Sequence, residues 1–239
     1  MIVSHKHRFI FMKTRKTAGT SVELALSPFC GPQDILTPIG RDERLRAEGT
    51  GARNTVIDRK ALPPLVRARL RLGAKPEAVG AVFVNHTKAR AARRVLGRKI
   101  WRTYFTFSIE RNPWDRQVSF YYWQYRNPEK RPAFETYLRD PHYRACIDNF
   151  GIYGIRDEVI VDQVLRYENL AEDFAAVLQR LGLPADTSLP RVKAAPRPKG
   201  AHYSSLYTPE TRDLVASWYR REIEAFGYTF DDREMQSGS

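Results

Sequence analysis

An apolar run at residues 8–12, followed at once by a polar loop, is the feature that most constrains the fold of this chain. The run has no polar alternation, which is typical of a strand buried on both faces of a parallel sheet. In the loop at residues 13–21, Thr20 or Ser21 can cap a helix over residues 22–26. The sequence therefore predicts a strand–loop–helix unit, with the loop at the carboxyl end of the strand.

Strand and helix patterns alternate along the rest of the chain. We expect further strands at residues 78–84, 100–109 and 159–165, and helices at residues 88–96, 112–125, 168–181 and 208–226. Residues 28–80 are rich in Gly, Pro and Arg, and we interpret them as a variable insertion with one amphipathic segment at residues 62–72. The alternation predicts an α/β fold with right-handed crossovers. We expect a single domain over residues 1–239.

The charge indicates an anionic partner, because 40 Lys and Arg residues against 27 Asp and Glu give a formal charge of +13. Nucleic acid, an acidic membrane surface, a nucleotide cofactor and a sulfated or phosphorylated acceptor all fit this sign. Cys30 and Cys146 lie far apart and outside any zinc-ligand spacing, so we expect neither a disulfide nor a metal site. The apolar run near the amino end is too short for a signal peptide or a membrane span, which predicts a soluble, cytoplasmic protein.

The loop at residues 13–21 has the composition of an oxyanion cradle. In open α/β sheets, ligands bind beyond the carboxyl ends of the strands, where a helix N-terminus offers N–H groups to an anion. Gly19 allows a close backbone approach. Charge and hydroxyl groups come from Arg15, Lys16, Thr17, Thr20 and Ser21. A solvated basic turn has the same composition, so composition alone leaves both interpretations open.

The order of the loop residues disfavours a nucleotide-kinase phosphate loop. Such a loop needs Gly-x-x-x-x-Gly-Lys-Ser/Thr, with the lysine after the second glycine. Here Lys16 precedes Gly19, and the first glycine is missing. ATP or GTP binding in that manner is therefore not expected.

A second ligand-binding pattern begins at Arg111, where a predicted strand ends. Asn112 is a good N-cap, and Pro113 suits the first position of a helix. Ser119 lies two helical turns after the cap, so its hydroxyl faces back toward Arg111. The two side chains can share one ligand, although an arginine that pairs with a nearby carboxylate at a helix start fits the pattern as well.

The two patterns together resemble the sulfotransferase family. The stretch from Lys16 to Ser21, Lys-Thr-Ala-Gly-Thr-Ser, is similar residue for residue to the 5′-phosphosulfate loop of carbohydrate sulfotransferases and their bacterial relatives. Arg15 stands where that loop usually has proline. The Arg-Asn-Pro-x-Asp-Arg-x-x-Ser-x-Tyr spacing from Arg111 resembles the family's 3′-phosphate element. The resemblance is closest to bacterial relatives of the heparan sulfate 2-O type, and it does not cover residues 28–80.

This resemblance implies a P-loop-like three-layer fold with a central, mainly parallel sheet flanked by helices. It implies an enzyme that moves the sulfuryl group of 3′-phosphoadenosine 5′-phosphosulfate (PAPS) to an acceptor hydroxyl, leaving the 3′,5′-bisphosphate PAP, without a metal. Tyr167 would lie against the adenine, and Lys199 and Gly200 would belong to a basic loop over the 3′-phosphate. The residues implied to bind PAPS are Arg15, Lys16, Thr17, Ala18, Gly19, Thr20, Ser21, Arg111, Ser119, Tyr167, Lys199 and Gly200.

Two residues are candidates for the chemical step. Charge builds on the bridging oxygen of the leaving bisphosphate, much as in phosphoryl transfer, and Lys16 is the candidate to stabilise it. A base must take the acceptor proton, and His86 has an intrinsic pKa that suits this role. His86 also matches a histidine of carbohydrate sulfotransferases, but a capping or surface histidine fits its position too. Weaker candidates are His5, His7, His142 and His202.

Two other functions stay open at the level of sequence. A P-loop-fold kinase predicts magnesium-dependent ATP binding. A basic protein that binds nucleic acid or acidic glycans predicts a steep salt dependence and no response to PAPS, but no zinc-finger or RNA-recognition signature supports it, and we expect no nucleic-acid partner. Family analogy favours a glycan or glycolipid acceptor, and the charge also allows peripheral contact with an acidic membrane.

Overall fold

The structure is a computed structural model that describes residues 1–190, 192, 197, 198 and 200–234. The chain divides into two compact units. Unit 1 comprises Met1–Glu110 and Gly151–Val192, and unit 2 comprises Arg111–Phe150 and Lys193–Ser239. The chain therefore enters unit 2 at Arg111, and a single domain over the whole chain stays a prediction.

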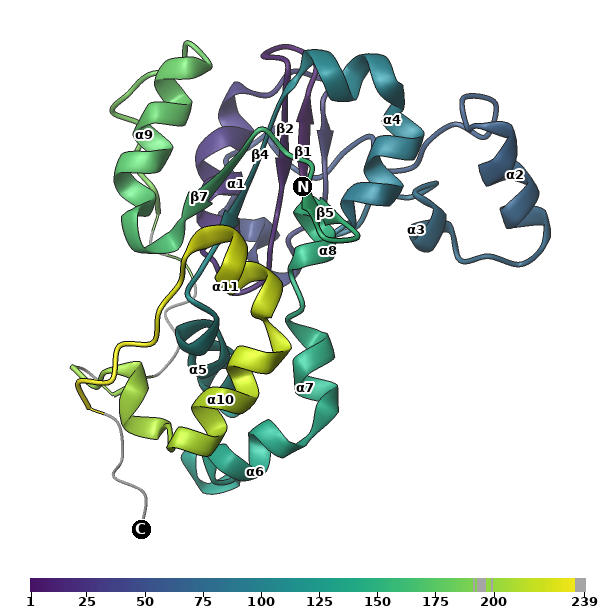
Figure 1. Ribbon diagram of the computed structural model, residues 1–239. Helices are drawn as coiled ribbons and strands as arrows, with labels where there is room; N and C mark the ends of the chain where they lie inside the picture. Colours follow the sequence, from purple (N-terminus) through teal and green to yellow (C-terminus); the bar gives the residue numbers. More distant parts are fainter. Residues whose placement is uncertain (191, 193–196, 199, 235–239) are drawn as a thin grey trace. The chain divides into compact units, whose positions relative to one another are not determined.

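Unit 1 is built on a five-stranded sheet with the order β3-β1-β2-β4-β7 (Figure 1). Its centre is parallel: β2 (Phe9–Met12) pairs with β4 (Phe105–Glu110), and β4 pairs with β7 (Gln163–Arg166). β1 (Ile2–Ser4) runs antiparallel to both β2 and β3 (Ile35–Leu36). Every residue of β2 and β4 is buried, as predicted for strands covered on both faces. The expected α/β fold with a mainly parallel central sheet is confirmed.

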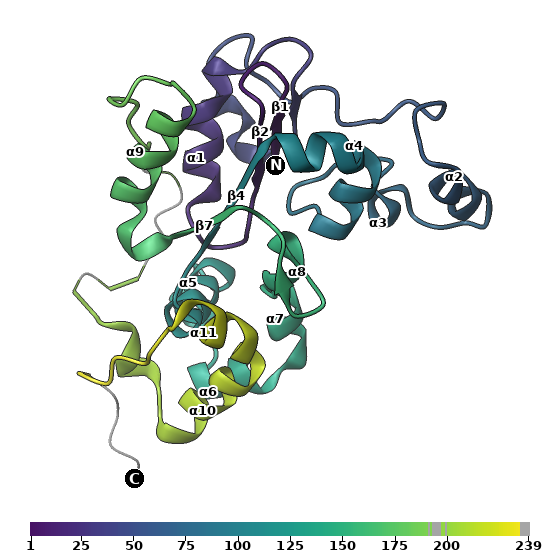
Figure 2. The ribbon, with the colours of Figure 1, turned by 45° about the horizontal axis from the view of Figure 1, so that its top comes forward.

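Helices cover both faces of this sheet (Figure 2). On one face, α1 (Gly19–Leu26) and α9 (Leu170–Arg180) pack onto the phenylalanines of β2 and β4. On the other face lies α4 (Ala89–Thr103). The helix predicted at residues 168–181 is thus present as α9, after a 3₁₀ turn at Tyr167–Asn169.

The strand predicted at residues 78–84 is wrong. Residues Pro76–Val79 form a short helix, α3, and Gly80 then turns the chain with φ 82° in the left-handed region. Beyond it, Val82 makes a single isolated bridge with Val56. Val79 and Ala81 of this segment pack under α2 (Pro64–Arg71), so part of its apolar run is buried in a cluster outside the sheet.

Three other predicted boundaries change. α4 runs to Thr103 across a break at Gly97, so the strand predicted from residue 100 begins only at Phe105. The strand predicted at residues 159–165 divides into β6 (Glu158–Val159), which pairs with β5 (Gly154–Ile155), and β7. The predicted insertion contributes β3 to the main sheet. The strand β1 was not predicted, because it has only three residues and the turn that joins it to β2, His5–Arg8, contains none of the residues typical of a hairpin turn.

Unit 2 is helical and has an aromatic core. Its helices are α5 (Pro113–Gln124), α6 (Phe134–Arg139), α7 (Pro141–Cys146), α10 (Pro209–Trp218) and α11 (Arg220–Phe226). The chain leaves unit 2 within α8 (Phe150–Tyr153). The helix predicted at residues 208–226 is divided into α10 and α11 at Tyr219, where φ is −116° and ψ is 29°. Trp114, Val118 and Tyr121 of α5 are buried in the core, as their spacing predicts.

No helix within the described ranges is both long enough and apolar enough to cross a membrane.

Candidate active site

The loop between β2 and α1 has a backbone shaped by two left-handed residues. Lys16 has φ 61° and Ala18 has φ 60°, a region that residues other than glycine seldom occupy and that is enriched at ligand sites. The carbonyl of Ala18 accepts from the N–H groups of Ser21 (2.9 Å) and Val22 (3.3 Å), so α1 begins at Gly19. The first turn of α1 is therefore part of the loop that the sequence predicts to bind an anion.

The prediction that Thr20 or Ser21 caps α1 is wrong, because the left-handed Ala18 starts the helix before both hydroxyls. Ala18 is the N-cap residue, and no side chain caps the helix. The first turn holds no acidic residue either. A helix N-terminus with this composition attracts an anion through its N–H groups and its dipole.

Gly19 is required by close packing at the start of α1. A Cβ atom at this position would lie 2.7 Å from Cγ of Lys13 and 3.4 Å from the carbonyl oxygen of Thr14. The nearer distance is too short for any side chain, so the loop can fold back on the helix only with glycine here. The neighbour that requires glycine here is Lys13, and the close approach of an anion to the backbone at Gly19 stays a prediction.

Lys13 is held by a buried ion pair that sequence reasoning missed. Its Nζ lies 2.7 Å from Oε2 of Glu23, and the side chains are 3% and 0% exposed. The other oxygen of Glu23 contacts the amino group of Met1. Burial by itself would raise the pKa of Glu23, but the charges of the Met1 amino group and Lys13 lower this pKa overall. The one signal in the sequence was a carboxylate within an otherwise apolar turn, residues 22–26.

Two threonine hydroxyls attach the loop to β4. The hydroxyl of Thr14 donates to the carbonyl oxygen of Ile109, and Oγ1 of Thr17 lies 2.8 Å from Oγ1 of Thr14. Because a carbonyl oxygen only accepts, the Thr14 proton is used there and Thr17 donates to Thr14. The proton of the Thr17 hydroxyl is thus engaged inside the loop, where it fixes the loop's shape.

His86 lies against the first residue of this loop. Its Nδ1 is 3.0 Å from the carbonyl oxygen of Lys13, and since that oxygen only accepts, Nδ1 carries the proton and Nε2 keeps its lone pair. Burial, followed by the charge of Arg15, lowers the pKa of His86 to about 3. The imidazole is therefore neutral, with Nε2 able to accept a proton.

In unit 2, the start of α5 forms as predicted. Oδ1 of Asn112 accepts from the N–H groups of Trp114 (3.1 Å) and Asp115 (3.4 Å). Nε and Nη2 of Arg111 lie 2.8 and 2.6 Å from Oδ2 of Asp115, and Nη1 of Arg197 lies 2.8 Å from Oδ1. One carboxylate thus holds two guanidinium groups side by side, and the carboxylate pairing foreseen for Arg111 is present.

The remaining predicted residues are distributed over both units. Ser119 is half-buried on α5, and its hydroxyl has no hydrogen-bond partner within the described part of unit 2. Tyr167 follows β7 in unit 1, half-buried against the core of the sheet. Gly200 lies in an exposed turn with φ 80°. Lys199 falls outside the described residues.

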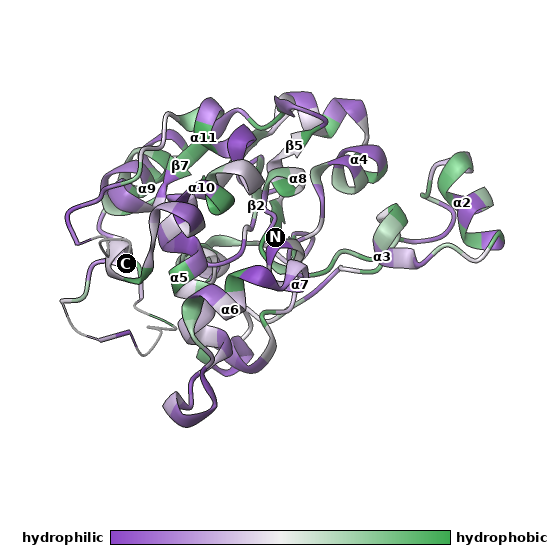
Figure 3. Cartoon of the chain, turned by 60° about the horizontal axis from the view of Figure 1, so that its bottom comes forward, coloured by the Kyte–Doolittle hydropathy of each residue, from purple (hydrophilic) through white to green (hydrophobic). Residues whose placement is uncertain are grey.

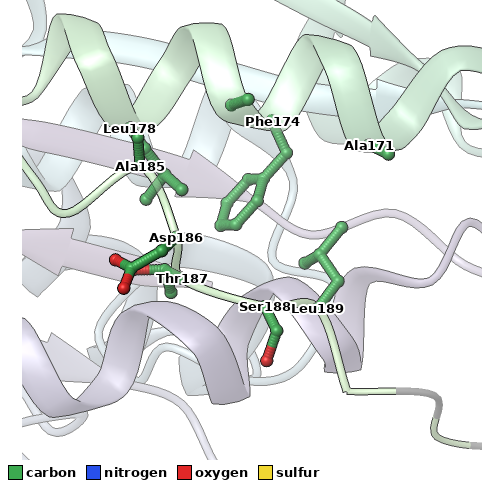
Figure 4. A pocket seen from close by; sticks show the side chains of 9 residues that line it. Ala171, Phe174, Leu178, Ala185, Asp186, Thr187, Ser188 and Leu189 are labelled. Atoms are coloured by element: carbon green, nitrogen blue, oxygen red, sulfur yellow. The ribbon is translucent and has the colours of Figure 1, made fainter.

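A separate hollow of about 270 Å³ lies beside α9, lined mainly by apolar side chains such as Phe174, Leu178 and Leu189 (Figure 4). It contains none of the predicted site residues. Across the ranges that the structure describes, no group of three or more His, Cys, Asp and Glu side chains is arranged to hold a metal ion.

The family comparison covers both the loop and the Arg111 element. The model described as "Sulfotransferase family" matches residues 1–229. The chain belongs to the sulfotransferase family. It is therefore a sulfotransferase, an enzyme that transfers sulfuryl groups to an acceptor hydroxyl.

Two other proteins are similar to this chain. An uncharacterized protein of Archaeoglobus fulgidus is 32% identical over 104 residues, which are 39% of this sulfotransferase and 81% of that protein. A crystal structure of a sulfotransferase from Alicyclobacillus acidocaldarius is 17% identical, with a TM-score of 0.40 over 93% of this chain and 96% of the other. A likeness of that size carries no argument about the site.

Proposed function

We propose that this sulfotransferase uses PAPS as its donor and that the loop at residues 15–21 holds the phosphosulfate group. The observation that carries the proposal is the uncapped start of α1 at Gly19, directly after the left-handed residues Lys16 and Ala18. Such a backbone directs N–H groups and one lysine toward an anion. An anion is the ligand that this charge and this geometry favour.

Each of the two units contains a basic group that suits one anionic end of PAPS. One basic group is the loop in unit 1, with Arg15 and Lys16. The other is the pair of arginines on Asp115 together with the hydroxyl of Ser119, and we assign the 3′-phosphate to Arg111 and Ser119. Tyr167, Lys199 and Gly200 are proposed to contact the adenine and the 3′-phosphate, by resemblance to the family.

The donor supplies a sulfuryl group on a good leaving group, and the protein's contribution is positioning and charge. Lys16 is proposed to stabilise the negative charge that develops on the leaving oxygen. The buried Lys13–Glu23 pair and the Thr14 bond to β4 keep this loop in place before any ligand binds. Preorganised charge of this kind contributes more than charge that must first be ordered.

His86 is proposed as the base that accepts the proton of the acceptor hydroxyl at Nε2. Its bond to the Lys13 carbonyl fixes the tautomer, and its low pKa keeps it unprotonated. A pKa of about 3 makes a weak base. A donor with several negative charges on the adjacent loop raises that pKa, since nearby negative charge favours the imidazolium. The base would thereby gain strength when the donor is bound.

For the acceptor, we propose a hydroxyl of a carbohydrate or a glycolipid, and for the compartment, the cytoplasm. The support for the acceptor is the similarity of the loop to that of carbohydrate sulfotransferases. Trp123 on α5, stacked on Phe120 with ring centroids 5.5 Å apart and 37% exposed, offers an aromatic face of the kind that sugars stack on.

A transfer assay with sulfur-labelled PAPS tests the proposal. Wild-type protein should label at least one acceptor in a panel of glycans, glycolipids and phenols, whereas Lys16→Ala should remove the transfer. Lys130→Ala, which removes an exposed lysine of unit 2, is the matched control and should keep full activity. Undiminished turnover by Lys16→Ala would refute the assignment of Lys16. Labelling of an acceptor by ATP that carries a labelled γ-phosphate, with magnesium, and not by PAPS would favour a kinase.

A further inference from the structure

The positive charge of this chain is concentrated in one stretch. Residues 59–109 hold thirteen Lys and Arg residues and one acidic residue, Glu77, so the stretch carries +12 of the formal +13. The proposed donor site takes only His86 from it. The proposed donor site therefore does not explain the positive charge of this stretch. Its basic residues are Arg59, Lys60, Arg67, Arg69, Arg71, Lys75, Lys88, Arg90, Arg93, Arg94, Arg98, Lys99 and Arg102.

Part of this stretch also exposes large apolar side chains. We call residues 56–75, which contain α2, the arm. Its side chains Val56, Leu65 and Leu72 are 72%, 62% and 86% exposed, the three most exposed among the large hydrophobic residues in the described ranges. Figure 1 shows α2 of the arm lying apart from the sheet, beyond α3 and α4. Figure 3 shows hydrophilic and hydrophobic residues side by side on it.

The exposed leucines do not belong to the core of unit 1. α2 buries Val66 against Leu62 and Val79, which satisfies its inward face. Leu65 and Arg69 are four residues apart on one face of α2, and Leu72 is the residue that follows the last turn of this helix. The arm thus presents an outward apolar stripe with basic residues in it and beside it.

The part of α4 before its break at Gly97 belongs to the same packed region, because Val95 packs into the cluster beneath α2. Its exposed basic side chains are Arg90 and Arg93, and Arg98, Lys99 and Arg102 follow after the break. Two neighbouring helices therefore combine positive charge with exposed leucine, which is the composition of a segment that lies in a membrane interface.

We infer that the arm docks onto the surface of an anionic lipid bilayer, with Leu65 and Leu72 inserted among the lipids and the arginines paired with their headgroups. Nucleic acid or an acidic polysaccharide would satisfy the charge but would leave the leucines in water. A second copy of the chain would satisfy the leucines but would bring the same excess of positive charge against itself. A bilayer with anionic headgroups satisfies both features. This inference does not depend on the identity of the sulfuryl acceptor.

Sedimentation with vesicles tests the inference. The full chain should bind vesicles that contain phosphatidylserine or phosphatidylglycerol, release from them at high salt, and leave phosphatidylcholine vesicles unbound. Each basic residue near an anionic surface contributes about fivefold in partitioning, so Arg69→Ala/Arg71→Ala should weaken binding roughly 30-fold. Leu65→Asn/Leu72→Asn should weaken it on the order of 100-fold, because two leucines no longer leave water.

Matched controls separate the arm from charge in general. Arg139→Ala/Arg220→Ala removes two exposed charges from unit 2, and Leu45→Asn replaces a half-exposed leucine outside the arm. Both should keep vesicle binding, and all variants should keep the wild-type thermal unfolding curve. Full vesicle binding by the Leu65→Asn/Leu72→Asn variant would overturn the inference. The inference would also be overturned if the wild-type chain bound no anionic vesicles but bound heparin or RNA, and if Arg69→Ala/Arg71→Ala removed that binding.

Discussion

Replacing Glu23 by glutamine tests the buried ion pair that supports the anion loop. Nζ of Lys13 lies 2.7 Å from Oε2 of Glu23, and both side chains are nearly without solvent exposure. Glutamine keeps the size and one acceptor oxygen but removes the charge, so the Lys13 ammonium stays buried without its counterion. Removing one member of a buried pair costs about 3–5 kcal/mol. We expect the free energy of unfolding to fall by about 3 kcal/mol, since the amide oxygen still accepts a hydrogen bond.

The double variant Lys13→Met/Glu23→Gln separates the lost charge from lost packing. Apolar or neutral replacements of a whole buried pair are often close to neutral in stability. The double variant should therefore recover the part of the loss that Lys13 causes, whereas the Met1 amino group, the other partner of Glu23, lacks its counterion in both variants. Urea unfolding followed by circular dichroism gives the free energies for the four proteins of this cycle.

Two results would refute this reasoning. One is a loss below about 1 kcal/mol for Glu23→Gln, which would mean that the pair is solvated. The other is a double variant less stable than either single variant, which would mean that packing rather than charge dominates. Transfer activity gives an independent readout, because the Lys13 carbonyl holds His86, and activity should fall in Glu23→Gln even where the protein is fully folded.

Three further predictions concern the site and its supports. His86 has a pKa of about 3 in the folded protein but near 6.5 in the unfolded chain, so the unfolded chain binds the extra proton and the folded state loses stability as the pH falls through this range. In urea titrations, His86→Gln should reduce the loss of stability between pH 6.5 and 4.5 by about 2–3 kcal/mol. A pH dependence of stability that His86→Gln leaves unchanged would contradict the burial of His86. Arg111→Ala should weaken binding of PAP about 10- to 100-fold in calorimetry while transfer at saturating PAPS persists, and unchanged affinity would remove Arg111 from the donor site. Asn112→Ala should lower the free energy of unfolding by about 1 kcal/mol through loss of the α5 cap, and a stability equal to wild type would show that the cap is dispensable.

The parts of the fold that the sequence predicts correctly are those whose pattern lies within a few consecutive residues. The apolar run at Phe9–Met12, followed by a loop and a helix, predicted β2 and α1 correctly. Asn112 and Pro113 predicted the start of α5. Segments whose state depends on distant partners were not predictable. Residues 78–84 have the apolar pattern of a strand, but Val79 and Ala81 pack in the cluster under α2. The two residues of β3 become a strand only through their pairing with β1 at the start of the chain.

The candidate site divides in the same way. The loop residues were found because their order resembles a known family motif, and their left-handed backbone at Lys16 and Ala18 agrees with an anion site. The Lys13–Glu23 pair was missed, since the apolar neighbours of Glu23 indicate its burial but not its partner, which lies ten residues away. The caps expected from Thr20 and Ser21 failed because Ala18 starts the helix earlier.

The most direct test of the central claim is a calorimetric titration of the wild-type protein with PAP and, separately, with ATP. PAP should bind at least tenfold more tightly than ATP without added magnesium, and Lys16→Ala and Arg111→Ala should each weaken PAP binding. Equal or tighter binding of ATP, or PAP binding that neither variant affects, would contradict the assignment of the loop at residues 15–21 as the phosphosulfate site.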